Sequence, residues 1–479
     1  MSTTSQLTPT SQVRMGLARA DITPPVGIYH PMWGAARHHR ATGIHRPLVA
    51  DVVTFAPAAG EGHGWVQVQL DMVGLALQFH DDLRRAVAEA TGLPVEHVVL
   101  AYSHTHSGGL FSPDRVSLPG GELILPYLSE VQTKVAAAAK QAVADLHPTT
   151  LTYAWGRCNL AGNRDYWDAE NGLYACGYNP DAAADDTVLV IRATDADGAR
   201  RAAIVNYACH PTTLAWENTL VSPDYVGALR ETVEQATGAP CLFTLGACGN
   251  LGPRRGYVGD TNVADANGRQ LAYAVLSTLT AMDPPGQDFA YRGPVVSGAT
   301  LGTWGPVAQS AERTAAAQTM QGGHYRVDLP QKPRPDAAKL EQDMASLLAQ
   351  QAEADARGDA VAARDFGARA ERARRWLGRL RNLPEGQSYP YHFTVHRLGD
   401  ALWVGLGGEP YNVIQTELRA RYPDHPVVVT VLAGELSVAY LLPADRYGVG
   451  LYQEEPSILA AGCLEQLTEA VSQRIAALL

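Results

Sequence analysis

Short apolar runs rich in β-branched residues alternate along this chain with amphipathic helical patterns. The helical patterns at residues 80–92 and 225–238 each end in a glycine, as helices commonly do. Such alternation is typical of α/β proteins, and a content of 46% hydrophobic residues in a chain of 479 provides for a large core. We therefore predict an α/β fold with a mixed β-sheet core flanked by helices. The runs predicted as strands are residues 52–58, 64–74, 97–103, 187–194, 202–210, 239–250, 391–410 and 426–443.

One segment departs from this alternation. Residues 337–383 are dense in Ala, Arg and Glu and contain almost no β-branched residues, which predicts a helical hairpin that turns near Gly358. Strand-like runs resume after it, so we interpret the hairpin as an insertion within one α/β unit. Its arginines are interspersed with Glu and Asp, which favours a solvated helix face over a binding surface for an anionic partner.

Charge and cysteine content exclude several classes of partner. The formal net charge is −11 and no stripe of Lys and Arg with interleaved aromatics occurs, so we expect no nucleic-acid partner. No apolar run approaches the ~18 residues of a membrane span, and the polar N-terminus lacks a signal peptide, so we expect no stable membrane association and a cytoplasmic location. The six cysteines lack C-x-x-C spacing, which indicates reduced thiols and leaves nitrogen and oxygen ligands for any metal. Formation of a homo-oligomer is left open.

Side chains able to bind a metal gather where predicted strands end. The stretch "AYSHTHSGG" places His104 and His106 at such an end, and residues i and i+2 of an extended segment point to the same face. Two hydrogen-bonded structural histidines would explain this pair equally well. However, His210, Glu409 and Tyr440 stand at or near the ends of three further strands, and α/β folds build their sites at such ends. The four segments together favour a metal site.

Asp71 lies within the otherwise apolar run 64–74. Its carboxylate could accept the second N–H of a ligand histidine, as carboxylates beside metal sites often do. It could equally cap nearby backbone amides. The sequence leaves both interpretations open.

Eight motifs of the chain resemble, in the same order, the catalytic domain of neutral/alkaline non-lysosomal ceramidases. They are "GLARADITPPVG", "TGIHRPL", "SHTHSGG", "GNRDYW", "NYACHPTTL", "TLGACGNLGP", "GLGGEP" and "SVAYLLPADRYGVGLYQEE". The resemblance extends over residues 14–475 and implies a single ceramidase-like α/β catalytic domain, with the helical insertion at 337–383 inside it. It also implies a zinc-dependent hydrolase that cleaves an amide bond.

The same resemblance implies roles for seven residues. His106 would take up a proton from the attacking water, and Arg164 and Tyr452 would meet the carbonyl group of the substrate. One zinc ion per chain would be bound by four ligands: His104, His210, Glu409 and Tyr440. Zinc prefers such nitrogen and oxygen ligands, and catalytic zinc sites keep a position open for water.

Some features depart from the ceramidase pattern. Asn250 and Gly252 stand where ceramidases have an Asp and a catalytically important Ser. We expect no immunoglobulin-like C-terminal domain of the kind that secreted ceramidases have, and no membrane-binding amphipathic helix is evident. We therefore expect a small soluble amide as the substrate. The alternatives are a lactone or other ester hydrolysed at the same zinc site, a true ceramidase, and a non-catalytic zinc scaffold or regulator.

Overall fold

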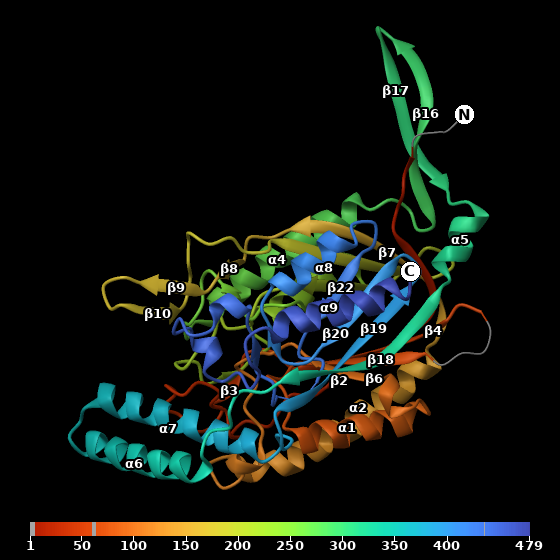
Figure 1. Ribbon diagram of the computed structural model, residues 1–479. Coiled ribbons are helices and arrows are strands. Elements are labelled where there is room, and N and C mark those ends of the chain that lie inside the picture. The colour runs from red at the N-terminus through yellow and green to blue at the C-terminus, as the bar shows by residue number, and fades with distance from the viewer. Residues whose placement is uncertain (1–4, 60–63, 435) are drawn as a thin grey trace.

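A large mixed β-sheet forms the centre of the molecule (Figure 1). The computed structural model describes residues 5–59, 64–434 and 436–479, so Glu435, in the predicted strand run 426–443, lies outside the described residues. The sheet has eight strands, in the order β14 (Cys241–Leu245), β12 (Arg200–Tyr207), β11 (Thr187–Thr194), β7 (His147–Arg157), β2 (Thr10–Asp21), β4 (Val49–Pro57), β5 (Trp65–Leu70) and β6 (Val98–Tyr102). The pairs β12–β14 and β5–β6 are parallel and the other neighbours are antiparallel.

A second sheet packs face to face against the first. Its four strands are β18 (Met320–Pro330), β19 (Ser388–Leu398), β20 (Ala401–Leu406) and β22 (Val427–Thr430). One buried apolar cluster draws residues from both sheets. Within it the ring of Trp403 lies 5.4 Å from that of Phe55 and 5.9 Å from that of Trp65, measured between centroids. The two sheets therefore share an apolar core.

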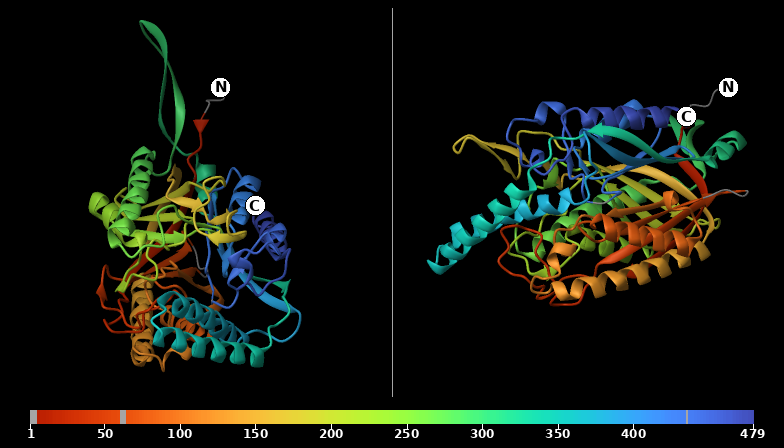
Figure 2. Two further views of the ribbon diagram at one scale, coloured as in Figure 1. Left: turned by 90° about the vertical axis from the view of Figure 1, so that its left-hand side faces the viewer. Right: turned by 60° about the horizontal axis from the view of Figure 1, so that its bottom comes forward.

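Helices cover the outer faces of both sheets (Figure 2). Those on the large sheet are α1 (Leu77–Thr91), α2 (Ile124–Ala144), α3 (Tyr225–Thr237) and α4 (Thr261–Ala281), and those on the small sheet are α8 (Val413–Arg421) and α9 (Cys463–Ala476). α1 and α3 end as predicted, at Gly92 and Gly238, which adopt left-handed φ angles of 69° and 68°. The prediction of an α/β fold with a mixed sheet flanked by helices is confirmed.

Two antiparallel helices, α6 (Ala337–Ala356) and α7 (Ala360–Leu380), occupy the segment predicted as a helical hairpin. Gly358, with a φ of 74°, lies between them. The prediction of a solvated charged face is wrong for Glu371, because Arg115, only 1% exposed, donates to both of its carboxylate oxygens at 2.8 and 2.5 Å. This ion pair attaches the hairpin to the body of the protein. In the part of the chain described here, no helix is long and apolar enough to cross a membrane.

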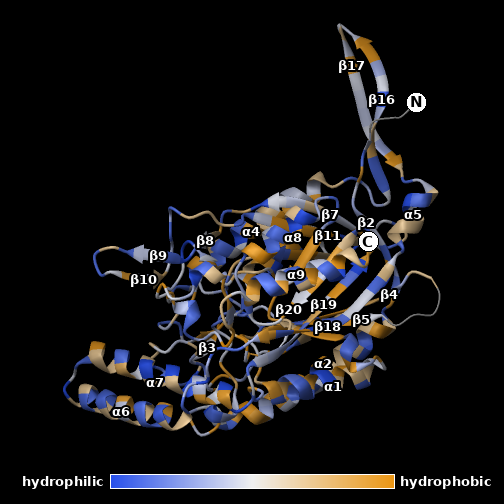
Figure 3. Cartoon of the chain, in the orientation of Figure 1, coloured by the Kyte–Doolittle hydropathy of each residue, from blue (hydrophilic) through white to orange (hydrophobic). Residues whose placement is uncertain are grey.

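A long hairpin of β16 (Gln287–Ser297) and β17 (Ala299–Ala308) projects from the body of the molecule (Figure 1). The sequence analysis did not predict it. Residues 293–308 contain no charged side chain, and Val296 near the tip is 83% exposed. Colouring by hydropathy shows few strongly hydrophilic positions along its outer part (Figure 3).

The remaining short elements lie mainly in the loops that join these layers. Two of the pairs matter for the site, namely β8 (Ala161–Asn163) with β15 (Leu251–Pro253), and β21 (Glu409–Pro410) with β23 (Tyr440–Leu441). The others are β1 (Ser5–Gln6), β3 (Gly43–Ile44), β9 (Asp165–Asp168), β10 (Leu173–Cys176), β13 (Leu220–Val221) and α5 (Ala311–Ala317).

Candidate metal centre and catalytic site

His104 and His106 lie in a turn rather than in a strand. β6 ends at Tyr102, and the backbone of His104 is left-handed, with a φ of 67°. We predicted that the two side chains converge because they alternate along a strand. That explanation is wrong, because the strand ends before both residues. The His104 amide donates to the carbonyl of Met72 at 2.9 Å, and the two imidazole rings meet edge to face with centroids 4.7 Å apart. Strained backbone of this kind is retained mainly where the geometry serves a site.

His210 follows β12 and is held by the backbone that follows β14. Its Nδ1 donates to the carbonyls of Cys248 and Leu251 at 2.7 and 3.1 Å. His104 is held in the same way, since its Nδ1 donates to the carbonyl of Val73 at 2.6 Å. Carbonyl oxygens only accept hydrogen bonds, so Nδ1 carries the proton in both residues. Each Nε2 is thereby left with a lone pair available to a metal.

Glu409 and Tyr440 are brought together by strand pairing. They are direct partners in the parallel pair β21–β23, and the Glu409 amide donates to the carbonyl of Ala439 at 2.7 Å. Gly408 makes this approach possible, because it has a φ of 65° and a Cβ atom there would lie 2.5 Å from that same carbonyl oxygen. The second glycine of "GLGGEP" therefore sets the position of Glu409.

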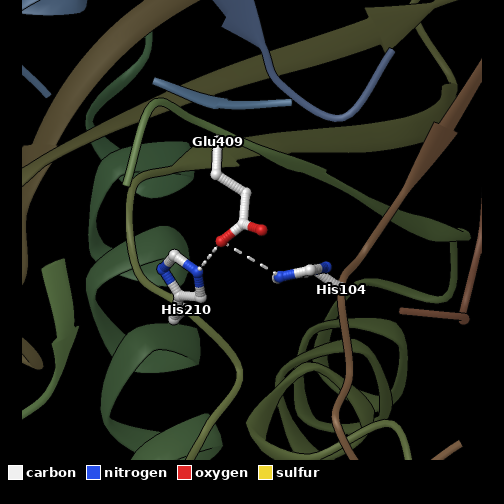
Figure 4. Close-up of side chains that lie close together, drawn as sticks. All are labelled: His104, His210 and Glu409. Atoms are coloured by element: carbon white, nitrogen blue, oxygen red, sulfur yellow. Dashed lines mark hydrogen bonds and ion pairs between the residues drawn. The ribbon is translucent and has the colours of Figure 1, made fainter. Parts of the chain in front are cut away.

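Three of the predicted ligands converge on one point (Figure 4). Oε2 of Glu409 lies 2.8 Å from Nε2 of His210 and 3.4 Å from Nε2 of His104. All three residues are buried, and their candidate ligand atoms lie within 4.8 Å of one another. We call His104, His210 and Glu409 the ligand triad.

The electrostatics of the triad suit a cation. Burial, together with the nearby charge of Arg164, lowers the pKa of His210 to about 4, so its imidazole is neutral at pH 7. Two imidazole lone pairs and a carboxylate oxygen then face one another in a buried space. Such an arrangement is repulsive unless a proton or a metal ion lies between these atoms, and the 2.8 Å contact of His210 Nε2 with Glu409 Oε2 has the length of a hydrogen bond.

His106 lies beside the triad but is oriented differently. Its Nδ1 donates to the carbonyl of His104 at 3.0 Å, so its Nε2 is the nitrogen able to accept a proton. Burial and the neighbouring His104 and His210 lower the pKa of His106 well below its ordinary value. The ring centroid of His106 is 6.2 Å from that of His210. The structure thus places a neutral proton acceptor next to the triad.

Arg164 connects the triad to Tyr440. It follows β8, whose pairing with β15 brings it to the backbone at Gly249, where its Nη2 donates to the carbonyl at 2.8 Å. The same nitrogen donates to the hydroxyl oxygen of Tyr440 at 2.9 Å and lies 3.5 Å from Nε2 of His210. Burial raises the pKa of Tyr440 well above its usual range, whereas the charge of Arg164 acts in the opposite direction. Arg164 therefore favours electron density on the Tyr440 oxygen.

Tyr440 and Tyr452 form the outer part of the site. The ring of Tyr440 stacks 6.3 Å from that of His210, and the ring of Tyr452 meets Tyr440 edge to face at 5.9 Å. Tyr452 is 41% exposed and belongs to a short helical turn, Tyr452–Glu454. The structure therefore gathers all seven predicted site residues, with Tyr452 at the solvent side.

Asp71 does not contact a ligand histidine. Its two carboxylate oxygens accept hydrogen bonds from Nη2 of Arg230 at 2.5 and 2.7 Å, and Oδ2 also accepts from the amide of Val49 at 3.0 Å. Of the two interpretations left open by the sequence, backbone capping is the one observed, with a buried ion pair in addition. Backbone carbonyls take the place of a carboxylate behind His104 and His210.

The two positions that depart from the ceramidase pattern lie on either side of Leu251. The Asn250 side chain accepts from the amide of Asn412 at 2.8 Å, which stabilises the start of α8. A Cβ atom on Gly252 would lie 3.6 Å from Oγ1 of Thr212 and 3.8 Å from Cδ of Arg164. That Thr212 hydroxyl is buried and has no hydrogen-bond partner among the described residues, which no sequence pattern could have indicated.

Three aromatic residues that were not predicted as site residues form a cluster that reaches His106 through Trp33. The ring of Trp33 is 5.1 Å from that of His106 and meets Tyr257 and Trp216 edge to face at 5.6 and 6.3 Å. We call Trp33, Trp216 and Tyr257 the aromatic cluster. They come from three separate loops, so no local periodicity could have indicated that they meet.

Comparison with known proteins agrees with the resemblance inferred from the sequence. The sequence profile described as "Neutral/alkaline non-lysosomal ceramidase, N-terminal" matches residues 13–242. Neutral ceramidase from Pseudomonas aeruginosa is 28% identical over 251 residues, which is 50% of this chain and 37% of that protein. The aligned part thus spans little more than a third of the relative. The resemblance to neutral ceramidases is confirmed.

Two solved structures share the fold over almost the whole chain. The crystal structure of neutral ceramidase from Pseudomonas aeruginosa matches with a TM-score of 0.64 and 19% identity, covering 98% of this chain and 75% of that one. A structure described as ceramidase complexed with C2 matches with a TM-score of 0.63 and 18% identity, covering 98% and 76%. At these identities the likeness concerns the fold.

Proposed function

Because residues 13–242 match the N-terminal domain of neutral/alkaline non-lysosomal ceramidases, we propose that this chain is a zinc-dependent hydrolase of amide bonds. The observation that carries the proposal is the ligand triad, in which two imidazole nitrogens with free lone pairs meet one carboxylate oxygen. Its neighbour His106 supplies the proton acceptor that hydrolysis by a metal-activated water requires.

The residues fit zinc by chemistry and by spacing. Histidine nitrogen and carboxylate oxygen are common zinc ligands, and a tetrahedral site with bonds of about 2.0 Å separates its ligand atoms by about 3.3 Å. The two contacts of Glu409 Oε2, at 2.8 and 3.4 Å, bracket that separation. Tyr440, paired with Glu409 and stacked near His210, is the proposed fourth ligand.

When bound, zinc would supply a Lewis acid and lower the pKa of a water molecule at the site. The protein's own residues do the rest. His106 accepts a proton at Nε2 from the attacking water and can return it to the leaving nitrogen, because its Nδ1–H is fixed on the carbonyl of His104. Arg164 stabilises negative charge that develops on the substrate's carbonyl oxygen. Its Nε and Nη2 are held by the carbonyl of Gly249 and by Tyr440, which fixes the orientation of the guanidinium.

We propose a small, soluble amide as the substrate. Gly252 offers no hydroxyl at the position where ceramidases have one, and only Thr212 Oγ1, 3.6 Å from the place of a Cβ atom, could replace it. Ester or lactone hydrolysis is the second candidate, because an alkoxide leaving group needs less protonation than an amine and so depends less on that missing hydroxyl. The arrangement of His106 serves either reaction.

The test is a screen of the zinc-loaded protein against soluble N-acyl compounds, lactams, esters and lactones, with metal content measured on the same sample. We expect about one zinc per chain and turnover of an amide that stops on chelation and returns with zinc. A protein that binds no metal after zinc supplementation would contradict the metal site. Turnover of lactones or esters alone would select the second candidate.

A further inference from the structure

The aromatic cluster beside His106 is placed as a binding surface rather than as core. Trp33, Trp216 and Tyr257 are half-buried, and none of them belongs to either buried apolar cluster of the described chain. Trp216 and Tyr257 stand at 77° and 85° to the plane of Trp33. Nearly perpendicular rings form a corner, in which a flat group can stack on one ring and meet the others with its edge.

The cluster is held rigidly from two sides. On one side α7 fixes the Trp33 loop, because Arg375 donates to the carbonyl of Met32 and Gly34 packs on Ala368. A Cβ atom on Gly34 would lie 3.1 Å from the Cα atom of Ala368, so the helix and the loop are in close contact. The position of Trp33 therefore depends on the helical hairpin.

On the other side Tyr257 is held in a conformation that it would not adopt freely. Its φ of 58° is left-handed, and its amide donates to the carbonyl of Thr212 at 3.1 Å, two residues after His210. A tyrosine in this region of φ is strained, so the surrounding structure must impose it. Both sides of the cluster are thus fixed before any ligand arrives, which reduces the entropy lost on binding.

One polar group of the cluster lacks a partner. Nε1 of Trp33 is buried and makes no hydrogen bond within residues 5–59, 64–434 and 436–479. A buried indole N–H usually donates to an acceptor, and leaving it unpaired costs free energy. Because this nitrogen is closed to solvent, it faces protein and takes no part in the surface that the three rings present.

The charge around the cluster selects among ligands. Ring faces attract cations as well as flat apolar groups. Here, however, the guanidinium of Arg164 lies 3.5 Å from Nε2 of His210, and a divalent ion on the triad would add two further positive charges. Together these positive charges outweigh the single negative charge of Glu409 and repel an ammonium group, so the cluster favours a planar ring without a positive charge.

We infer that the substrate carries a planar ring next to the bond that is cleaved, and that the aromatic cluster binds this ring. The inference rests on the proposed function and names its substrate class, an amide or ester of a planar aromatic or heteroaromatic group. It makes Trp33 a residue that determines substrate specificity.

The inference is tested by binding of ketones, which present a carbonyl but cannot be hydrolysed. Calorimetry on the zinc-loaded protein would compare acetophenone with cyclohexyl methyl ketone. Stacking predicts that acetophenone binds about threefold to tenfold more tightly than its non-planar analogue. Trp33→Leu should bring this ratio close to one, and Trp33→Phe should keep it. Trp155→Leu, which removes a tryptophan 47% exposed on β7, serves as the control.

Equal affinities for acetophenone and its cyclohexyl analogue in the unmodified protein would overturn the inference. So would a ratio that survives both Trp33→Leu and Trp33→Phe. Because ketone binding needs no turnover, the two proposals fail separately. If the protein prefers the planar ring but hydrolyses no amide or ester, the proposed hydrolase activity is rejected and the aromatic cluster remains a ring-binding surface. If it hydrolyses an amide or ester without preferring a planar ring, the inference about the ring is rejected and the proposed activity remains.

Discussion

Replacing His106 by alanine should abolish most of the activity and leave the metal in place. The two neighbouring histidines are positioned by backbone carbonyls at Val73, Cys248 and Leu251, none of which belongs to His106. Its loss therefore leaves the ligand triad with all of its own supports. The side chain is only half-buried, so we expect a loss in the free energy of unfolding of about 1 kcal/mol.

The size of the kinetic effect follows from the role of Nε2. A positioned general base contributes about 10²-fold to 10⁴-fold, which is about 2.7–5.5 kcal/mol in the activation barrier. Because burial lowers the pKa of His106 below the ordinary value of 6.5, the neutral form should persist as the pH falls through 6.5. The rate of the unmodified enzyme should therefore stay level across that range instead of declining.

The assay combines kcat, its pH profile and zinc content, measured on one preparation of His106→Ala. Added imidazole should restore part of the rate, since it can accept a proton in the vacated space. His147→Ala is a matched control, because the side chain of that histidine is 59% exposed and its replacement should alter none of the three quantities. A metal-free His106→Ala protein would refute the reasoning and make His106 a ligand, and an unchanged kcat would remove it from the mechanism.

Three further predictions concern the triad and its surroundings. His210→Ala should bind zinc at least about 100-fold more weakly, seen as metal lost on dialysis; full retention would exclude His210 as a ligand. Gly408→Ala should lower the free energy of unfolding by about 2 kcal/mol, because its Cβ would lie 2.5 Å from the Ala439 carbonyl oxygen. Gly286→Ala, at a φ of 70° with nothing within 4 Å, should cost less in the same denaturant titration, and equal losses would rule out the clash. Gly252→Ser should not create ceramidase activity, since burying two lipid chains requires pocket walls at roughly 0.8 kcal/mol per methylene. A kcat/KM for short-chain ceramide equal to that of the best soluble substrate would contradict this.

Hydrophobic periodicity is a local property and predicted part of the regular structure, whereas β2, β7 and β18 lay outside the predicted runs. The run 187–194 coincides with β11, and the glycines at 92 and 238 end α1 and α3 where the pattern stops. The hairpin of β16 and β17 was missed because its outer half is rich in Gly and Pro and packs against no core. Where tertiary burial does not impose a pattern, periodicity gives no signal.

For the site, the sequence indicated which residues take part but not how they come together. The candidate residues could be found from their positions near strand ends, whereas their contacts could not. Glu409 and Tyr440 pair through two-residue strands, which are too short to show a pattern. Asp71 forms its ion pair with Arg230, which lies 159 residues away in the sequence. The left-handed backbone of His104 could not be predicted either, because residues other than glycine rarely adopt it. Long-range pairing and backbone strain are properties of the folded chain.

The ligand triad also has a consequence for how the chain folds. His104 and His210 follow strands of the eight-stranded sheet, whereas Glu409 follows β20 of the four-stranded sheet, 199 residues beyond His210. Contacts at such separation form late, since the loop between them must close first. Either sheet alone would hold an incomplete set of ligands. Tight capture of zinc during refolding would therefore mark the moment at which the two sheets dock, after most secondary structure has formed.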